Sequence, residues 1–176
     1  MAIPKKVINF FEKAKVKYQP IKHRTVYTAF DKSQTLKVPQ KVIGKTLVMK
    51  LDNRPAIILI PANKNLNIQA LKKATKVKKI DFIKEAWMKK NLKGVKIGAI
   101  PPIGSLWKLP TFLDRSLTGP SEIIINSGNY NFSIKVKGNV LKKSMIAEAS
   151  PHLSPRLAKQ NSAIGSIIGN FAKAKK

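Results

Sequence analysis

Residues 43–61 read IGKTLVMKLDNRPAIILIP, two apolar runs separated by the turn-forming residues Asp-Asn-Arg-Pro. The runs at 43–51 and 56–61 have the length and composition of strands, and the polar residues between them favour a tight connection. This stretch therefore predicts a hairpin of two strands.

Lys45 stands near the start of the first of these strands. Alternate side chains of a strand share a face, so Lys45 points the same way as Leu47, Met49 and Leu51, while Lys50 lies on the opposite face. A lysine at the head of an apolar row either reaches into a cleft or extends to water, and the pattern leaves both interpretations open.

Hydrophobic periodicity and capping residues predict the remaining elements. The predicted helices span 4–16, Thr25 or Thr28 to Leu36, a short segment capped by Asn67, a segment capped by Asp81 that runs through Trp87, and 140–149. The predicted strands span 18–24, 75–80, 95–97, 105–108, 122–126 and 131–136, with turns at 117–120, 127–129 and 137–139. Short spacing between strands favours antiparallel pairing, so we expect an α+β domain with a compact, curved, mostly antiparallel mixed β-sheet, barrel-like and surrounded by helices.

Residues 94–104, GVKIGAIPPIG, break an apolar stretch with glycines and a double proline. Pro101 and Pro102 fix φ and lack an N–H, while Gly98 and Gly104 permit backbone angles or a close approach that a side chain would block. A stiff loop of this kind can hold backbone N–H groups around a small polar group. The alternative is an ordinary connection between strands.

Composition limits the chemistry that the chain can perform. Its 176 residues suit one domain, which we expect at 1–149, followed by a basic C-terminal extension at 150–176 outside that domain. There is no cysteine, and the two histidines are far apart in sequence, so we expect no metal site, no cofactor and no serine–histidine–aspartate triad. The N-terminal residues lack an apolar run long enough for a signal peptide, and we expect a cytoplasmic protein.

The charge is strongly one-sided, with 35 Lys+Arg against 8 Asp+Glu and a formal net charge of +27. Such a field attracts polyanions, and nucleic acids are the expected partner in the cytoplasm, ahead of anionic membrane surfaces. Lysine greatly outnumbers arginine, which suits attraction to phosphates better than reading of bases. A lysine-rich genome is the alternative explanation of the charge.

Two motifs together resemble the YbaK/ProX family, the domain of free-standing aminoacyl-tRNA deacylases that is also inserted in bacterial prolyl-tRNA synthetases. The motifs are Gly44-Lys45-Thr46-Leu47-Val48 and, some fifty residues later, Gly98-Ala99-Ile100-Pro101-Pro102-Ile103-Gly104. Further landmarks in the same order are Thr28-Ala29, Ile60-Pro61-Ala62 and Leu113-Asp114 with Leu117. The order matches across about residues 5–146. Where many members have glutamates after the threonine, this chain has Phe30-Asp31-Lys32-Ser33, which leaves the amino-acid specificity open.

The resemblance implies a trans-editing enzyme that hydrolyses the ester of a mischarged aminoacyl-tRNA. We accordingly expect catalysis from Lys45, Gly98 and Pro102. We expect substrate binding by a second group of residues: Thr28, Ala99, Ile100, Pro101, Gly104, Asp114, Ser127 and Gly128. An activated ester needs placement and stabilisation of negative charge more than a strong nucleophile. The implied partner is tRNA, an aminoacyl-tRNA synthetase is left open as a second partner, and we expect a monomer that does not bind membranes.

Other interpretations of the same residues remain open. A non-catalytic, basic tRNA- or nucleic-acid-binding module explains the charge, and a membrane-surface protein is a third alternative. Asp114 either pairs with Arg115 or binds the substrate amino group. His23 is expected at the surface, Trp87 and Trp107 in the core, and Ser127-Gly128 either beside the pocket or in an ordinary hairpin turn.

Overall fold

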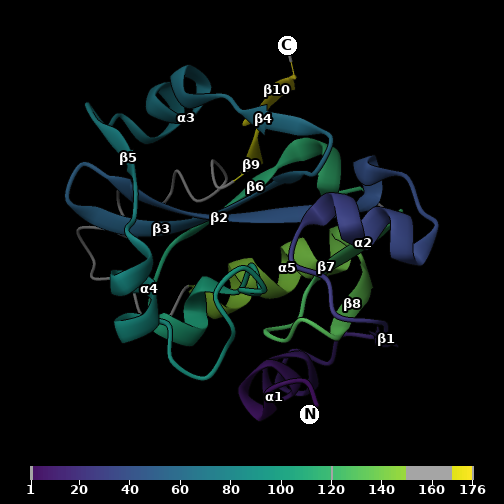
Figure 1. The fold of residues 1–176 in the computed structure, drawn as a ribbon. Helices are drawn as coiled ribbons and strands as arrows, with labels where there is room; N and C mark the ends of the chain where they lie inside the picture. The colour runs from purple at the N-terminus through teal and green to yellow at the C-terminus, as the bar shows by residue number, and fades with distance from the viewer. Residues whose placement is uncertain (1, 120, 150–167, 176) are drawn as a thin grey trace.

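The computed structural model describes residues 2–119, 121–149 and 168–175, and Figure 1 shows how their elements are arranged. The helices are α1 (Lys5–Lys13), α2 (Ala29–Leu36), α3 (Ile68–Thr75), α4 (Glu85–Asn91) and α5 (Gly138–Ala149). Short 3-10 helices are η1 (Gln40–Val42), η2 (Gly104–Trp107) and η3 (Arg115–Leu117). The strands are β1 (Tyr18–Lys22), β2 (Gly44–Leu51), β3 (Arg54–Pro61), β4 (Lys64–Leu66), β5 (Ile80–Phe82), β6 (Thr111–Asp114), β7 (Glu122–Asn126), β8 (Phe132–Lys137), β9 (Ile168–Gly169) and β10 (Ala172–Ala174).

The β2–β3 hairpin lies inside a five-stranded sheet of order β5-β2-β3-β6-β9. Its two strands pair antiparallel from Gly44 opposite Pro61 to Leu51 opposite Arg54, whereas β3 pairs parallel with β6 and β6 pairs parallel with β9. A three-stranded antiparallel sheet, β1-β8-β7, is linked to it by a parallel bridge between Ile43 and Ile124. The third sheet is the antiparallel pair β10-β4. The α+β class with a mixed, mostly antiparallel sheet is confirmed, and in the described part of the chain no sheet closes into a barrel.

The hairpin is buried on both faces because its apolar residues are continuous rather than alternating with polar ones. One face packs with α3 and the C-terminal strands in a cluster that contains Met49, Ile58, Leu71 and Phe171. On the other face, Val48 and neighbouring apolar residues pack against the α4 region. Leu59, on the same hairpin, packs into a core that is formed by α1, β7, β8 and α5. The predicted alternation of β2 is confirmed, since Leu47, Met49 and Leu51 share the first cluster and Val48 lies in another.

Capping chemistry explains where the helices begin. Thr28 Oγ1 accepts from the backbone N–H of Asp31 at 3.0 Å, which settles the choice between Thr25 and Thr28 at the start of α2. Asn67 Oδ1 accepts from Ala70 N and caps α3 as predicted. The strands expected at 122–126 and 131–136 and the helices expected at 4–16 and 140–149 are also present, with small differences at their ends.

Five local predictions are wrong for identifiable reasons. Residues 95–97 form a loop that leads into a turn, and residues 105–108 lie mostly in η2, where the N–H of Leu109 bonds back to Gly104 O at 2.9 Å. Asp81 caps no helix because it pairs with Lys50 inside β5, and most of 75–80 is loop. The turn expected at 137–139 does not form, because β8 runs directly into α5.

The C-terminal residues return to the domain. Residues 150–167 lie outside the described residues, but β9 pairs with β6, and β10 pairs with β4 from Ala172 opposite Leu66 to Ala174 opposite Lys64. The Phe171 side chain between these strands is 1% exposed and packs against Phe112 edge-to-face, with ring centroids 6.2 Å apart. The expectation that the whole extension lies outside the compact domain is therefore wrong for residues 168–174.

Candidate active site

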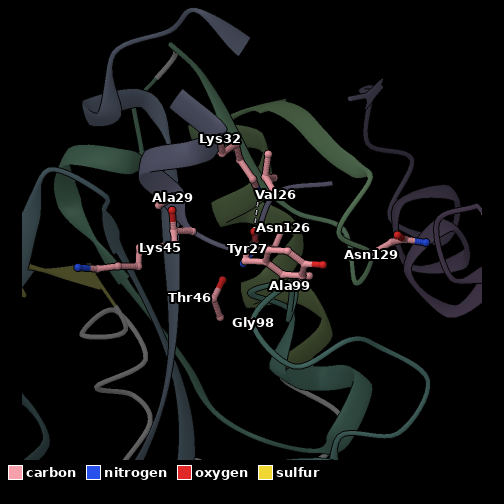
Figure 2. A pocket seen from close by; sticks show the side chains of 12 residues that line it. Val26, Tyr27, Ala29, Lys32, Lys45, Thr46, Gly98, Ala99, Asn126 and Asn129 are labelled. Carbon is pink, nitrogen blue, oxygen red and sulfur yellow. Dashed lines mark hydrogen bonds between the residues drawn. The ribbon is translucent and has the colours of Figure 1, made fainter. Parts of the chain in front are cut away.

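A cavity of about 250 Å³ opens where α2, the start of β2, the end of β7 and the turn at 96–99 meet (Figure 2). Its lining consists of Val26, Tyr27, Thr28, Ala29, Lys32, Gly44, Lys45, Thr46, Gly98, Ala99, Asn126 and Asn129. The two predicted motifs therefore do meet: their members Lys45, Gly98 and Ala99 line one cavity together with the predicted Thr28. Eight further lining residues were not predicted as site residues.

The β2 wall presents Lys45 and Thr46 in opposite directions. Figure 2 shows the Lys45 side chain extending away from Thr46 and Gly98, and its Nζ donates to the carbonyl oxygen of Lys64 at 2.9 Å. Partial burial lowers the pKa of Lys45, and the nearby positive charge of Lys175 lowers it further. The ammonium therefore stands at the side of the cavity, beside β4.

Gly98 shapes the opposite wall by allowing a tight turn. The N–H of Ala99 bonds to Lys96 O at 3.0 Å, and Gly98 has φ of +90° at the third position of this turn, where a side chain would be strained. Two bonds anchor the turn to the β7–β8 connection, Lys96 N to Gly128 O at 2.9 Å and Gly128 N to Ala99 O at 2.8 Å. No backbone carbonyl among the described residues accepts from the Gly98 N–H.

The rest of the glycine–proline loop lies in the protein interior, away from the cavity lining. Ile100, Pro101 and Pro102 are buried, and Gly104 donates its N–H to Thr111 Oγ1 at 2.9 Å. A Cβ at Gly104 would lie 2.2 Å from Leu109 O, so this glycine is needed for close packing. Of the loop residues expected at the site, only Gly98 and Ala99 line the cavity.

Asp114, Ser127 and Gly128 also lie outside the cavity lining. Asp114 is 4% exposed, caps η3 by accepting from Ser116, and accepts from the backbone N–H of Ala172 at 2.8 Å. Its described bonds thus tie the C-terminal segment to β6. Ser127 Oγ donates to Phe132 O at 2.7 Å, and Gly128 anchors the turn that contains Gly98.

Lys32 is a feature of the site that the sequence interpretation missed. It extends from α2 with only 6% of its surface exposed, and its Nζ donates to Asn126 Oδ1 at 2.6 Å (Figure 2). Burial lowers its pKa to about 8. The signal was its helical spacing, because Lys32 follows Ala29 by three residues and precedes Leu36 by four, which places it on the inward face of α2.

Thr46 lines the same cavity as Lys32, and the charge of Lys32 acts on His23. Thr46 Oγ1 is buried and has no hydrogen-bond partner among the described residues. His23 lies outside the cavity lining; its side chain is half-buried, and its Nε2 bonds to Ser133 Oγ at 2.9 Å. Burial lowers the pKa of His23, and the charge of Lys32 also contributes.

Two exposed aromatic side chains, Tyr27 and Phe30, stand at the start of α2, and Tyr27 lines the cavity. Tyr27 is 67% exposed and lies edge-to-face against Tyr130, with ring centroids 4.9 Å apart. The Tyr130 hydroxyl in turn donates to Ile97 O, in the turn that contains Gly98. Phe30, in the first turn of α2, is 58% exposed.

The part of the chain that the structure describes contains no group of three or more His, Asp or Glu side chains placed to hold a metal ion. None of its helices has the length and apolar character needed to cross a membrane.

Comparison with solved structures identifies the fold. The hypothetical protein APE2540 matches with a TM-score of 0.68 at 20% identity, covering 96% of this chain and 99% of its own. A candidate trans-editing enzyme for prolyl tRNA synthetase matches with a TM-score of 0.69 at 17% identity, covering 97% of this chain and 96% of its own. No curated protein sequence matches significantly.

Comparison with models of protein families assigns the sequence to a family. The model of the aminoacyl-tRNA editing domain matches residues 23–144, more than half of the chain. The match includes all twelve residues that line the cavity. The resemblance inferred from the two motifs is thereby confirmed, and the chain belongs to the aminoacyl-tRNA editing domain family.

Proposed function

We propose that this protein is a trans-editing aminoacyl-tRNA deacylase that hydrolyses the ester of a mischarged tRNA. The observation that carries the proposal is the single cavity lined by Lys45, Gly98 and Ala99, in a chain of the aminoacyl-tRNA editing domain family. The aminoacyl group enters this cavity, and the ribose of the terminal nucleotide stays at its mouth beside Tyr27.

The reaction requires little beyond placement and charge stabilisation. A water oxygen adds to the ester carbonyl carbon, the bond from that carbon to the ribose oxygen breaks, and the ribose oxygen takes a proton. Negative charge develops on the carbonyl oxygen, where a fixed N–H donor and a cation are most effective. Gly98 supplies such a donor, because its N–H makes no hydrogen bond to a backbone carbonyl of the described residues.

In this proposal Lys45 supplies the cation. Its ammonium has three N–H groups, of which one is used by Lys64 O, so two remain for a phosphate or a ribose oxygen of the tRNA end on the β4 side of the cavity. Partial burial concentrates its field, since charges interact more strongly away from bulk water. Pro102 acts indirectly, as a buried support of the turn, instead of touching the substrate.

The tRNA body is the proposed source of affinity. A formal net charge of +27 attracts phosphates without regard to sequence, so binding depends on salt while the cavity selects the amino acid. The structurally similar candidate editing enzyme for prolyl tRNA synthetase makes tRNA for proline the first to test. The same similarity makes that synthetase the first partner to test.

The test is a panel of mischarged tRNAs, including alanyl-, cysteinyl-, seryl- and threonyl-tRNA, incubated with the purified full-length protein. We expect release of at least one amino acid, unchanged by chelator. A non-catalytic tRNA-binding module is the second candidate, favoured by the charge. Salt-dependent binding of tRNA without turnover of any aminoacyl ester would establish that alternative and overturn the deacylase.

A further inference from the structure

Lys32 is a buried cation that the proposed hydrolysis does not use. A buried cation normally has a carboxylate partner, but Lys32 Nζ donates to the neutral amide oxygen of Asn126, 2.6 Å away. None of the described residues that line the cavity is acidic. Asp31, its neighbour in α2, accepts instead from the Thr28 hydroxyl at 2.8 Å.

The donors around the cavity exceed the acceptors that the described residues supply. The Lys32 ammonium has three N–H groups and Asn126 accepts one of them. Thr46 Oγ1, on the β2 side, is buried and has no partner among the described residues. Lys32 and Thr46 line the same cavity from different elements (Figure 2). Buried polar groups of this kind need a partner beyond the described residues, such as water or a ligand.

The charge of the lining selects among ligands. At neutral pH Lys32 is mostly protonated, because burial lowers its pKa only to about 8. A cationic ligand group would meet Lys32 without a compensating carboxylate, and an apolar group would leave the buried donors unpaired, which is costly. Oxygen atoms with negative charge satisfy the ammonium and accept from the Thr46 hydroxyl as well.

We propose that Lys32 and Thr46 form an anion subsite inside the cavity, which binds a negatively charged oxygen group of the substrate. This proposal rests on the proposed function, because it places the group on an aminoacyl-tRNA. Two parts of that substrate carry the chemistry: the side-chain carboxylate of an acidic aminoacyl group, and the phosphate of the terminal nucleotide. The subsite would thereby determine which esters the protein accepts or how their RNA end is seated.

Calorimetry with non-hydrolysable analogues tests the subsite. The probes are 3′-amide-linked aspartyl- and asparaginyl-adenosine, which differ by one charge at nearly equal size, each with and without a 5′-phosphate. The proteins are the wild type and the variants Lys32→Met, Thr46→Val and Lys41→Met. Lys32→Met removes the charge but keeps an apolar side chain. Lys41→Met is the control, because it removes the same charge from an exposed position in η1. Thermal melting of each variant verifies folding.

We expect the wild type to bind the more anionic analogue at least tenfold more tightly in one of the two comparisons, aspartyl against asparaginyl or with against without the 5′-phosphate. Lys32→Met should reduce that ratio to about one, Thr46→Val should reduce it in part, and Lys41→Met should retain it. Preference for aspartyl over asparaginyl identifies the carboxylate as the bound group, and preference for the 5′-phosphate identifies the phosphate. Either result supports the subsite.

Equal affinity of the wild type for all four analogues, a preference that survives in folded Lys32→Met, or no binding at all would overturn the subsite. The mischarged-tRNA panel, run in parallel on the wild type, keeps the two proposals separate. Turnover without an anion preference contradicts the subsite alone. An anion preference without turnover of any aminoacyl-tRNA contradicts the deacylase and leaves the subsite standing.

Discussion

The two sides of the cavity each present a lysine, in opposite circumstances. On the β2 side, Lys45 is partly buried and rests against the carbonyl of Lys64, next to strands that the C-terminal segment completes. On the α2 side, Lys32 is almost fully buried and rests on an amide oxygen of β7. Burial lowers both pKa values, but only the shift of Lys32 is large. The comparison indicates that the position of Lys45 costs the folded protein little stability, whereas the burial of the Lys32 ammonium lowers the stability of the folded protein.

The largest expected effect is on the β2 side. Lys45→Ala should lower deacylation by two orders of magnitude or more, about 3 kcal/mol, the scale on which one oriented electrostatic group contributes to catalysis. Single-turnover rates with saturating protein measure the effect. Lys50→Ala is the control, since it removes the same charge from the opposite face of β2. Equal losses in the two variants would show that bulk charge carries the activity.

The second effect concerns the C-terminal strands beside Lys45. Phe171→Ala should lower the free energy of unfolding by about 3 kcal/mol, because it removes a large side chain that is 1% exposed and leaves a cavity. Phe82→Ala is the matched control, since Phe82 is 76% exposed and its removal should change stability by less than about 0.5 kcal/mol. Denaturant titration measures both. Similar stabilities of the two variants would mean that the C-terminal segment packs only weakly.

The third effect has the opposite sign and belongs to the α2 side. Lys32→Met should raise the free energy of unfolding at pH 7 by about 2 kcal/mol, because it removes the cost of a buried ammonium but leaves Asn126 Oδ1 without its donor. In a chain of this length that corresponds to roughly 4–8 °C in melting temperature. A variant less stable than the wild type would show that Lys32 is paired more favourably than its described contacts indicate.

The smallest effect is the dependence of that gain on pH. The pKa of Lys32 is about 8 in the folded protein and near 10.5 when unfolded, so the unfolded chain binds more protons between these values. The cost of burial is therefore complete below about pH 8 and disappears as pH rises toward 10.5. Between pH 7 and pH 9 the stability difference between Lys32→Met and the wild type should shrink by about 1 kcal/mol.

The surroundings of Lys32 make this measurement specific. The pKa of His23 is lowered mainly by burial, which the substitution leaves in place, and the bond of His23 to Ser133 does not involve Lys32. Lys45 keeps its lowered pKa in both proteins, so its titration cancels in the difference. A stability difference that does not change with pH would assign the effect of the substitution to packing instead of charge.

The sequence predicted those parts of the site that depend on local pattern. Continuous apolar residues identified the β2–β3 hairpin, and capping residues marked two helix starts: Asn67 for α3, and Thr28, with Thr25 as the alternative, for α2. The meeting of Lys45 with Gly98 followed from the resemblance, because no local pattern brings together residues more than fifty positions apart. The loop 100–104 was assigned to the site for its glycines and prolines, which instead serve close packing in the interior.

Other features depend on tertiary contacts that a pattern does not contain. Asp114 and Asp81 resembled a ligand and a helix cap, but their partners are Ala172 and Lys50, on distant strands. Lys32 was overlooked because lysines in helices are usually exposed. Strands β9 and β10 are only two and three residues long, too short to produce a periodic signal, and they form because β6 and β4 offer free edges.

The return of residues 168–174 to the sheet has a consequence for biosynthesis. Translation proceeds from the N-terminus, so β4 and β6 leave the ribosome long before the strands that pair with them. During that interval both present unpaired edges, which are templates for association with other chains. The sheets are therefore complete only after residues 168–174 have been synthesised, and the nascent protein passes through a stage in which a chaperone or the ribosome surface would have to protect these edges.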